Sequence, residues 1–192
     1  RISSSSTAES EAGWISPRYN AKWNGARNLA WPLLLLTMVY DETGNSKYIE
    51  EAKGIVRDLK SIQLDNGGFP ITLGPYVATT PFQDSITMEA LGRYHAVTKD
   101  AEAKDVFLRC AEHVVGGSSF PDGEWIYITH PDYRSGYTST QWGGFHFAYI
   151  FTGEKRFLEF PFPLIMRQLR FNQLGLNGGF ARGEGALSYP LR

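Results

Sequence analysis

The segment HPDYRSGY, residues 130–137, brings together side chains that can move protons and bind an anion. His130 can act as a general base and Tyr137 as a general acid. Arg134, which lies between them in the sequence, can pair with a carboxylate through its planar guanidinium. Polar clusters on long loops are frequently functional sites, so this set predicts proton transfer beside a bound carboxylate. The alternative is an ordinary polar loop held by aromatic anchors.

Two carboxylates form a second candidate set. Asp84 follows Gln83 at the predicted start of a helix, and Glu89 comes about one and a half turns later. In a hydrolytic pair, one carboxyl group protonates the leaving oxygen and the other activates water or attacks directly. The simpler interpretation of Asp84 is favoured, namely that it caps the free N–H groups of the helix, and Glu89 can equally point sideways.

An internal repeat sets the positions of these residues. A glycine-aromatic motif occurs three times at steps of about 55 residues, as Asp65-Asn66-Gly67-Gly68-Phe69, Asp122-Gly123-Glu124-Trp125 and Asn177-Gly178-Gly179-Phe180. A second marker follows the same period, as Thr43-Gly44, Thr98-Lys99-Asp100 and Thr152-Gly153. Two markers with one period indicate a repeat architecture. The glycine pairs are interpreted as turn residues that supply positive φ.

Each repeat predicts a hairpin of one buried and one amphipathic helix. Residues 29–40 are apolar nearly all round, and Pro32 predicts that this helix begins at Trp31 or is kinked. Gly44 suits the left-handed residue that ends this helix, and Ser46 suits the N-cap of the next, which runs to about Ile62.

The second and third hairpins repeat the contrast. Residues 83–97 form the second buried helix, and the amphipathic face that follows consists of Ala103, Val106, Phe107, Cys110 and Val114. The third hairpin begins near Thr138 and turns at Thr152-Gly153. Pro161 and Pro163 predict that its last helix is interrupted.

Loop lengths alternate along the chain. The turns within the hairpins are about four residues long, whereas residues 63–82 and 116–137 form long connections. Short turns should therefore lie on one face of the assembly. The long loops should lie on the other, beside the N-termini of the buried helices, where we expect the site.

The turn motifs Tyr40-Asp-Glu-Thr-Gly-Asn-Ser-Lys-Tyr48 and Tyr149-Ile-Phe-Thr-Gly-Glu-Lys-Arg-Phe157, together with the Gly-Gly-aromatic loops, carry a family resemblance. The chain resembles the (α/α) toroid proteins, and most closely their carbohydrate-active branch of polysaccharide lyases, uronyl-sugar hydrolases and sugar epimerases. The likeness covers about residues 23–182. It implies an all-α fold, a toroid or partial toroid of about three helical hairpins with long loops on one face.

The resemblance also divides the chain. Residues 1–22 are expected to form a Ser-rich arm and strap, and 23–182 the toroid repeats, in the units 23–69, 70–125 and 126–180. The tail 183–192 is expected to continue into a larger toroid. Toroids of this kind usually close with six or so hairpins, so three imply a part of a ring or an open arc.

The function implied by the resemblance is the cleavage of an acidic polysaccharide or oligosaccharide by β-elimination. His130 would then be the base, Tyr137 the acid and Arg134 the partner of the uronate carboxylate. The alternatives are a glycoside hydrolase that uses Asp84, an epimerase, and a non-catalytic binding or scaffolding half-toroid. The expected sugar groove is lined by Trp23, Asn24, Arg27, Trp125, Arg134, Trp142 and His146.

Composition and charge argue against several other classes of protein. The chain has 192 residues, 42% of them hydrophobic and 20% charged, which is typical of a globular domain. A net charge of −1 argues against nucleic acid or an anionic membrane as the main partner. The single cysteine, Cys110, argues against a zinc site, and neither a metal nor an organic cofactor is expected. Work on polysaccharides implies a secreted or periplasmic protein, with the remaining hairpins of the toroid as a further partner.

Overall fold

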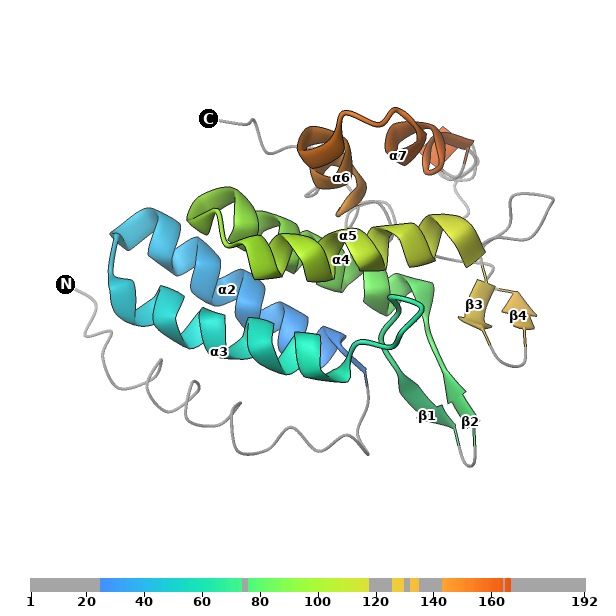
Figure 1. Ribbon diagram of the computed structural model, residues 1–192, viewed down its shortest axis with the longest axis horizontal. Helices are drawn as coiled ribbons and strands as arrows, with labels where there is room; N and C mark the ends of the chain where they lie inside the picture. Colours follow the sequence, from blue (N-terminus) through green and yellow to red (C-terminus); the bar gives the residue numbers. More distant parts are fainter. Residues whose placement is uncertain are drawn as a thin grey trace, which may run out of the picture.

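The computed structural model describes residues 25–73, 76–117, 126–129, 132–134, 143–163 and 165–166. Three helical hairpins follow one another along this part of the chain (Figure 1). They pair α2 (Arg27–Thr43) with α3 (Ser46–Ile62), α4 (Pro81–Thr98) with α5 (Ala101–Gly117), and α6 (Phe145–Thr152) with α7 (Arg156–Glu159). The predicted architecture of helical hairpins is confirmed.

The first helices of the hairpins form one row and the second helices another. Helix α4 lies at the centre and packs on α2, α5 and α6, while α3 packs on both α2 and α5. Figure 1 shows the turn between α2 and α3 and the turn between α4 and α5 at the same end of the molecule. The long connections leave from the opposite end, as the alternating loop lengths predicted.

The short turns use left-handed residues at the helix ends. Gly44 has φ 66° and its N–H donates to Tyr40 O at 2.7 Å, while Lys99 and Gly153 have φ 60° and 74°. The N-cap of α3 is Asn45, whose side chain accepts a hydrogen bond from Lys47 N at 3.1 Å. The prediction of Ser46 as the cap was wrong by one residue, because Asn also favours this position.

Helix α2 begins at Arg27 and contains Pro32, so a start at Trp31 was wrong, and the alternative of a kink at Pro32 stays a prediction. Helix α7 ends at Glu159, just before Pro161 and Pro163, so the predicted interruption of this helix is confirmed. The expected start of the third hairpin near Thr138 lies outside the described residues.

The outer helices bury the faces that their apolar spacing predicted. Helix α3 buries Ala52, Ile55, Val56 and Leu59. Helix α5 buries Ala103, Val106, Phe107, Cys110, Ala111 and Val114. Helix α4 is buried almost all round because three other helices surround it. The core therefore lies between the two rows of helices.

Two short β-hairpins lie within the long connections, which the sequence did not predict. Strands β1 (Ile71–Leu73) and β2 (Tyr76–Ala78) pair in antiparallel fashion. Strands β3 (Ile126–Thr129) and β4 (Asp132–Arg134) do the same, with an irregularity between Ile126 and Ile128. Both hairpins lie at the end of the helices from which the long connections leave (Figure 1).

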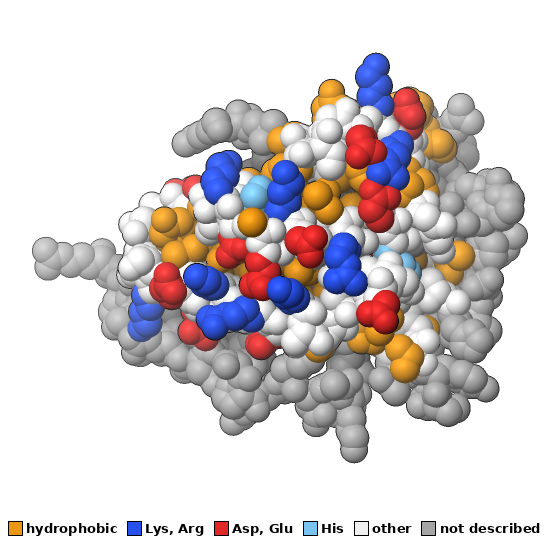
Figure 2. All heavy atoms as spheres, in the orientation of Figure 1, with side chains coloured by type: hydrophobic (Ala, Val, Ile, Leu, Met, Phe, Trp, Pro, Cys, Tyr) orange, Lys and Arg blue, Asp and Glu red, His pale blue; other side chains and the backbone are white. Residues whose placement is uncertain are grey.

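Charged side chains of both signs are interspersed over the face seen in Figure 2. Ion pairs link neighbouring elements: Lys60 Nζ of α3 lies 2.6 Å from Glu102 Oε1 of α5, and Arg156 of α7 contacts Glu112 of α5. Among the described residues, no helix is both long and apolar enough to cross a membrane.

Candidate functional site at the long-loop face

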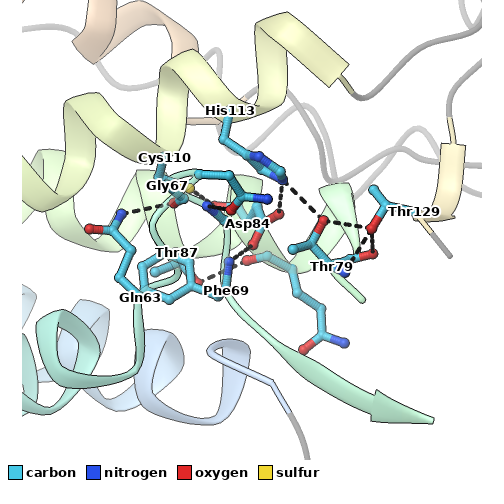
Figure 3. A network of polar contacts seen from close by, with 12 residues as sticks. Gln63, Gly67, Phe69, Thr79, Asp84, Thr87, Cys110, His113 and Thr129 are labelled. Carbon is cyan, nitrogen blue, oxygen red and sulfur yellow. Dashed lines mark hydrogen bonds and ion pairs between the residues drawn. The ribbon is translucent and has the colours of Figure 1, made fainter. Parts of the chain in front are cut away.

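Asp84 occupies the first turn of α4 and is fully buried. Its Oδ1 accepts a hydrogen bond at 3.1 Å from the backbone N–H of Phe69, which lies in the connection between α3 and β1. The N-cap of α4 is Thr80, so Asp84 does not take the capping position considered for it. The carboxyl group instead fastens the Asp65–Phe69 loop to the start of α4 (Figure 3).

His113 of α5 lies on the other side of the Asp84 carboxyl group. Its Nε2 is 3.0 Å from Thr79 Oγ1 and 3.8 Å from Asp84 Oδ2 (Figure 3). Burial lowers the pKa of His113, and a hydrogen bond to the backbone of Asn66 offsets part of this effect. The imidazole is therefore neutral at pH 7.

Burial raises the pKa of Asp84 to about 8, and the hydrogen bond from Phe69 opposes this shift. The protonated carboxyl group therefore prevails at neutral pH. Asp84 Oδ2 has no hydrogen-bond partner within the described part of the chain. Asp84 and His113 thus face each other as two neutral groups, not as an ion pair.

The loop that Asp84 holds is packed closely against α5. Gln63 Nε2 donates to Gly67 O and to Val106 O, each at 2.8 Å. Gly67 has φ +90°, and a Cβ there would lie 2.2 Å from Arg109 O. Gly68 needs no unusual φ, but a Cβ there would lie 2.5 Å from His113 Nε2. Only Gly67 of this pair is the predicted positive-φ residue, whereas Gly68 allows close approach.

The second long connection joins the same network through two threonines. Thr129 N donates to Thr79 O at 3.0 Å, and Thr79 N donates to Thr129 Oγ1 at 2.9 Å. The two hydroxyl groups are also within hydrogen-bond distance, at 3.1 Å. The β3–β4 hairpin is therefore anchored beside the N-terminal end of α4 (Figure 3).

The predicted acid–base loop begins directly after Thr129. His130 and Tyr137 lie outside the described residues, as do Trp23, Asn24, Trp125 and Trp142. Arg134 is the last residue of strand β4, and in the antiparallel register it lies opposite Ile126 of β3. The functional roles predicted for these residues stay predictions.

Arg27 begins α2 and is exposed, with its guanidinium carbon 5.7 Å from the centroid of the Phe82 ring of α4. Trp31, one turn further along α2, is 52% exposed. The starts of α2 and α4 thus present a cation and two aromatic rings. This arrangement is compatible with the role in ligand binding predicted for Arg27.

A second group of titratable side chains lies between α4 and α6. Glu89 and Arg93 of α4 and His146 in the first turn of α6 are all partly buried. Burial raises the pKa of Glu89, and the charge of Arg93 opposes this shift. Burial also lowers the pKa of His146, with Arg93 adding to the effect and a hydrogen bond to Gly143 opposing it. Arg93 is thus a charged neighbour of both Glu89 and His146.

Three members of the buried network, Thr79, His113 and Thr129, could not be predicted from the sequence. His113 resembled an ordinary core or surface histidine, and the threonines carry no motif. The one signal available was Gly68, since a second glycine that no turn requires can mark close approach by another segment. Among the described residues, no three His, Cys, Asp or Glu side chains lie close enough to hold a metal ion.

No protein-family model and no curated protein sequence matches this chain. Solved structures do resemble it. A polysaccharide lyase superposes with a TM-score of 0.62 at 17% identity, covering 90% of this chain and 54% of its own. A glycosyl hydrolase of family 88 from Bacteroides vulgatus gives 0.60 at 14% identity, covering 90% and 56%.

A third match is an inactive variant of the GH76A α-1,6-mannanase of Salegentibacter sp. HEL1_6 in complex with α-1,6-mannotriose. Its TM-score is 0.58 at 13% identity, covering 90% of this chain and 49% of its own. The chain spans about half the length of the solved structures that it matches. These neighbours are (α/α) toroid carbohydrate-active enzymes, and the chain has their helical-hairpin toroid fold.

Proposed function

We propose that the protein is a carbohydrate-active enzyme that cleaves an acidic polysaccharide by β-elimination at its long-loop face. The substrate is a chain of uronosyl residues, and the reaction needs a base for the C5 proton, an acid for the leaving oxygen and a cation for the carboxylate. The fold that the chain shares with a polysaccharide lyase supports this proposal. A secreted or periplasmic location is part of the same proposal.

The observation that carries the proposal is the buried network around Asp84. This network holds two segments at the start of the inner helix α4. The Asp65–Phe69 loop is held through Phe69, and the β3–β4 hairpin is held through Thr129. Long loops held rigidly beside inner-helix N-termini are what a preorganised site requires. The segment that carries the predicted acid–base residues is part of one of these two connections.

Glycoside hydrolysis is the second candidate. It is favoured by the same fold likeness, since two of the three neighbours described above are a GH76 mannanase and a family 88 hydrolase. A hydrolase consumes water and leaves a saturated sugar, whereas β-elimination leaves an unsaturated uronate. The two reactions are therefore distinguished by their products.

The test is digestion of a panel of polysaccharides, with polygalacturonate, alginate and hyaluronan as acidic substrates and α-mannan as a neutral one. We expect new reducing ends together with the ultraviolet absorbance of an unsaturated uronate. Reducing ends without that absorbance would establish the hydrolase instead. The absence of new ends on every substrate would overturn both candidates. His130→Ala and Tyr137→Phe then test the roles predicted for the loop residues.

A further inference from the structure

One side of α4 keeps part of its surface exposed. Before the last turn of this helix, its residues are buried apart from Phe82, Glu89 and Arg93. Their spacing of seven and four residues places them on one face. This face is therefore the partly exposed one, whereas the rest of the stretch packs among α2, α5 and α6. It carries a carboxyl group and a guanidinium, which is an unusual use of a helix at the centre of a fold.

Helix α6 brings an imidazole to the same place through two glycines. A Cβ at Gly143 would lie 2.1 Å from Glu89 Oε2, and one at Gly144 would lie 2.3 Å from the Cβ of Met88. These glycines therefore let the start of α6 press against α4. His146 forms a hydrogen bond to the backbone of the same Gly143. Glu89 and His146 thus converge on one residue from two adjacent helices.

Burial shifts the pKa of each group of this pair toward the neutral form, although the charge of Arg93 opposes the shift of Glu89. Burial raises the pKa of Glu89 and lowers the pKa of His146. A raised pKa suits a carboxyl group to proton donation near neutral pH, and a lowered pKa leaves an imidazole available as a proton acceptor. Arg93 supplies a positive charge within interaction distance of both groups.

We propose that Glu89 and His146 are the proton-transfer pair of the enzyme, and that the positive charge of Arg93 stabilises the substrate carboxylate. This assignment rests on the β-elimination proposed above and gives Glu89 and His146 the acid and base roles that were predicted for Tyr137 and His130. Asp84 is fully buried beneath the Asp65–Phe69 loop, so it acts as a positioning residue. The substrate is a uronosyl residue linked through its C4 oxygen.

In the reaction, an imidazole nitrogen of His146 takes the C5 proton of the uronosyl residue. The electron pair of that C–H bond forms the C4–C5 double bond as the C4–O bond breaks. The Glu89 carboxylic acid gives its proton to the departing oxygen, so the leaving sugar ends in a hydroxyl group. Glu89 regains a proton and His146 loses one to solvent, and no water is consumed.

The experiment measures unsaturated uronate formation by the full chain with Glu89→Gln and His146→Ala. Each variant should lose at least about 100-fold in rate, the usual contribution of a general acid or base. Added imidazole should restore activity to His146→Ala and to no other variant. Glu42→Gln, at an exposed position of α2, and His95→Gln, on another side of α4, are the matched controls. Both should keep the wild-type rate.

The pH profile gives a readout that a structural role would not change. The wild type should lose activity in acid as His146 gains its proton, and in base as Glu89 loses its own. Glu89→Gln should lack the basic limb. Wild-type rates in both variants, or a loss that imidazole does not restore in a folded His146→Ala protein, would overturn the pair. A wild type that produces only saturated ends would overturn β-elimination itself.

Discussion

Asp84 carries a carboxyl group that the fold removes from water completely, and this has a thermodynamic consequence. The folded protein holds the Asp84 proton up to about pH 8, whereas the unfolded chain releases it near 3.8. Between these values the folded state binds the extra proton, so the free energy of unfolding falls as pH rises. The residue that anchors the loop therefore costs stability at neutral pH.

We expect Asp84→Asn to remove this dependence on pH. The amide oxygen can still accept the hydrogen bond from Phe69, but the side chain no longer titrates. Titration of Asp84 should lower wild-type stability by up to about 1.4 kcal/mol per pH unit between pH 6.5 and 8, and the variant should lack this contribution. Below pH 6.5, His113 and His146 contribute with the opposite sign, because their folded pKa values are lowered.

Urea unfolding at a series of pH values measures this difference. Asp105→Asn, at an exposed position of α5, is the matched control and should keep the wild-type slope. If Asp84→Asn also keeps that slope, burial of the Asp84 carboxyl group is not its source.

Gly67 and Gly54 offer a comparison between two glycines. Gly67→Ala should destabilise the protein by about 1–3 kcal/mol, because φ is +90° and the new Cβ would meet Arg109 O. Gly54→Ala should stabilise it by about 0.5–1 kcal/mol, because Gly54 is within α3 and a Cβ there meets nothing within 4 Å. Thermal unfolding measures the stability of both variants. Equal effects of the two substitutions would contradict the different roles given to Gly67 and Gly54.

At the scale of single residues, the sequence predicts which side chains are buried better than it predicts which other residues they contact. The apolar faces of α3 and α5 follow a period of 3.6, so their buried residues could be predicted one by one. His113 could not be placed, because its partners Thr79 and Asp84 are 34 and 29 positions away along the chain. Ser46 and Asn45 are both good caps, and local preference does not decide between neighbours.

At the scale of elements, helices were predictable and strands were not. A helix of about 17 residues, such as α3, repeats its pattern over several turns. Strands of three or four residues, such as β1 and β3, are too short for an alternating pattern to be recognised. What stabilises β3–β4 is a hydrogen-bond partner distant in sequence, Thr79, which no local pattern reveals.

Thr129→Val should release the β3–β4 hairpin from α4. The substitution keeps the shape of the side chain but removes the acceptor for Thr79 N–H, at a cost of about 1–3 kcal/mol. Hydrogen exchange should become faster in residues 126–129 and 132–134, while α3 keeps its protection. Thr43→Val, at the end of α2, is the control and should leave the hairpin unchanged. Unchanged exchange in Thr129→Val would show that other contacts hold the hairpin.

At the scale of the whole molecule, the inner helices depend on close approach. Gly92 of α4 faces the ring of Phe147 of α6, and a Cβ at Gly92 would lie 2.6 Å from the ring atom Cδ2. The distance between the second and third hairpins is therefore set at this contact. The repeat period predicted that the hairpins follow one another, but it contained no information on how closely they pack.

Gly92→Ala should push α6 away from α4. We expect a loss of about 1–3 kcal/mol from overpacking, together with lower activity, since His146 would move away from Glu89. The double variant Gly92→Ala with Phe147→Leu should recover part of both losses, because the smaller side chain leaves room for the methyl group. Calorimetry measures the loss of stability, and the formation of unsaturated uronate measures the loss of activity. No recovery in the double variant would mean that Phe147 is not the group displaced.

The tight turn at Gly44 lies at the end of the helices away from the long loops, and a Cβ at Gly44 meets nothing within 4 Å. A peptide tag, a fluorophore or a link to a solid support at this turn would therefore extend away from the loops. The protein can be immobilised there with its long-loop end directed toward the solution.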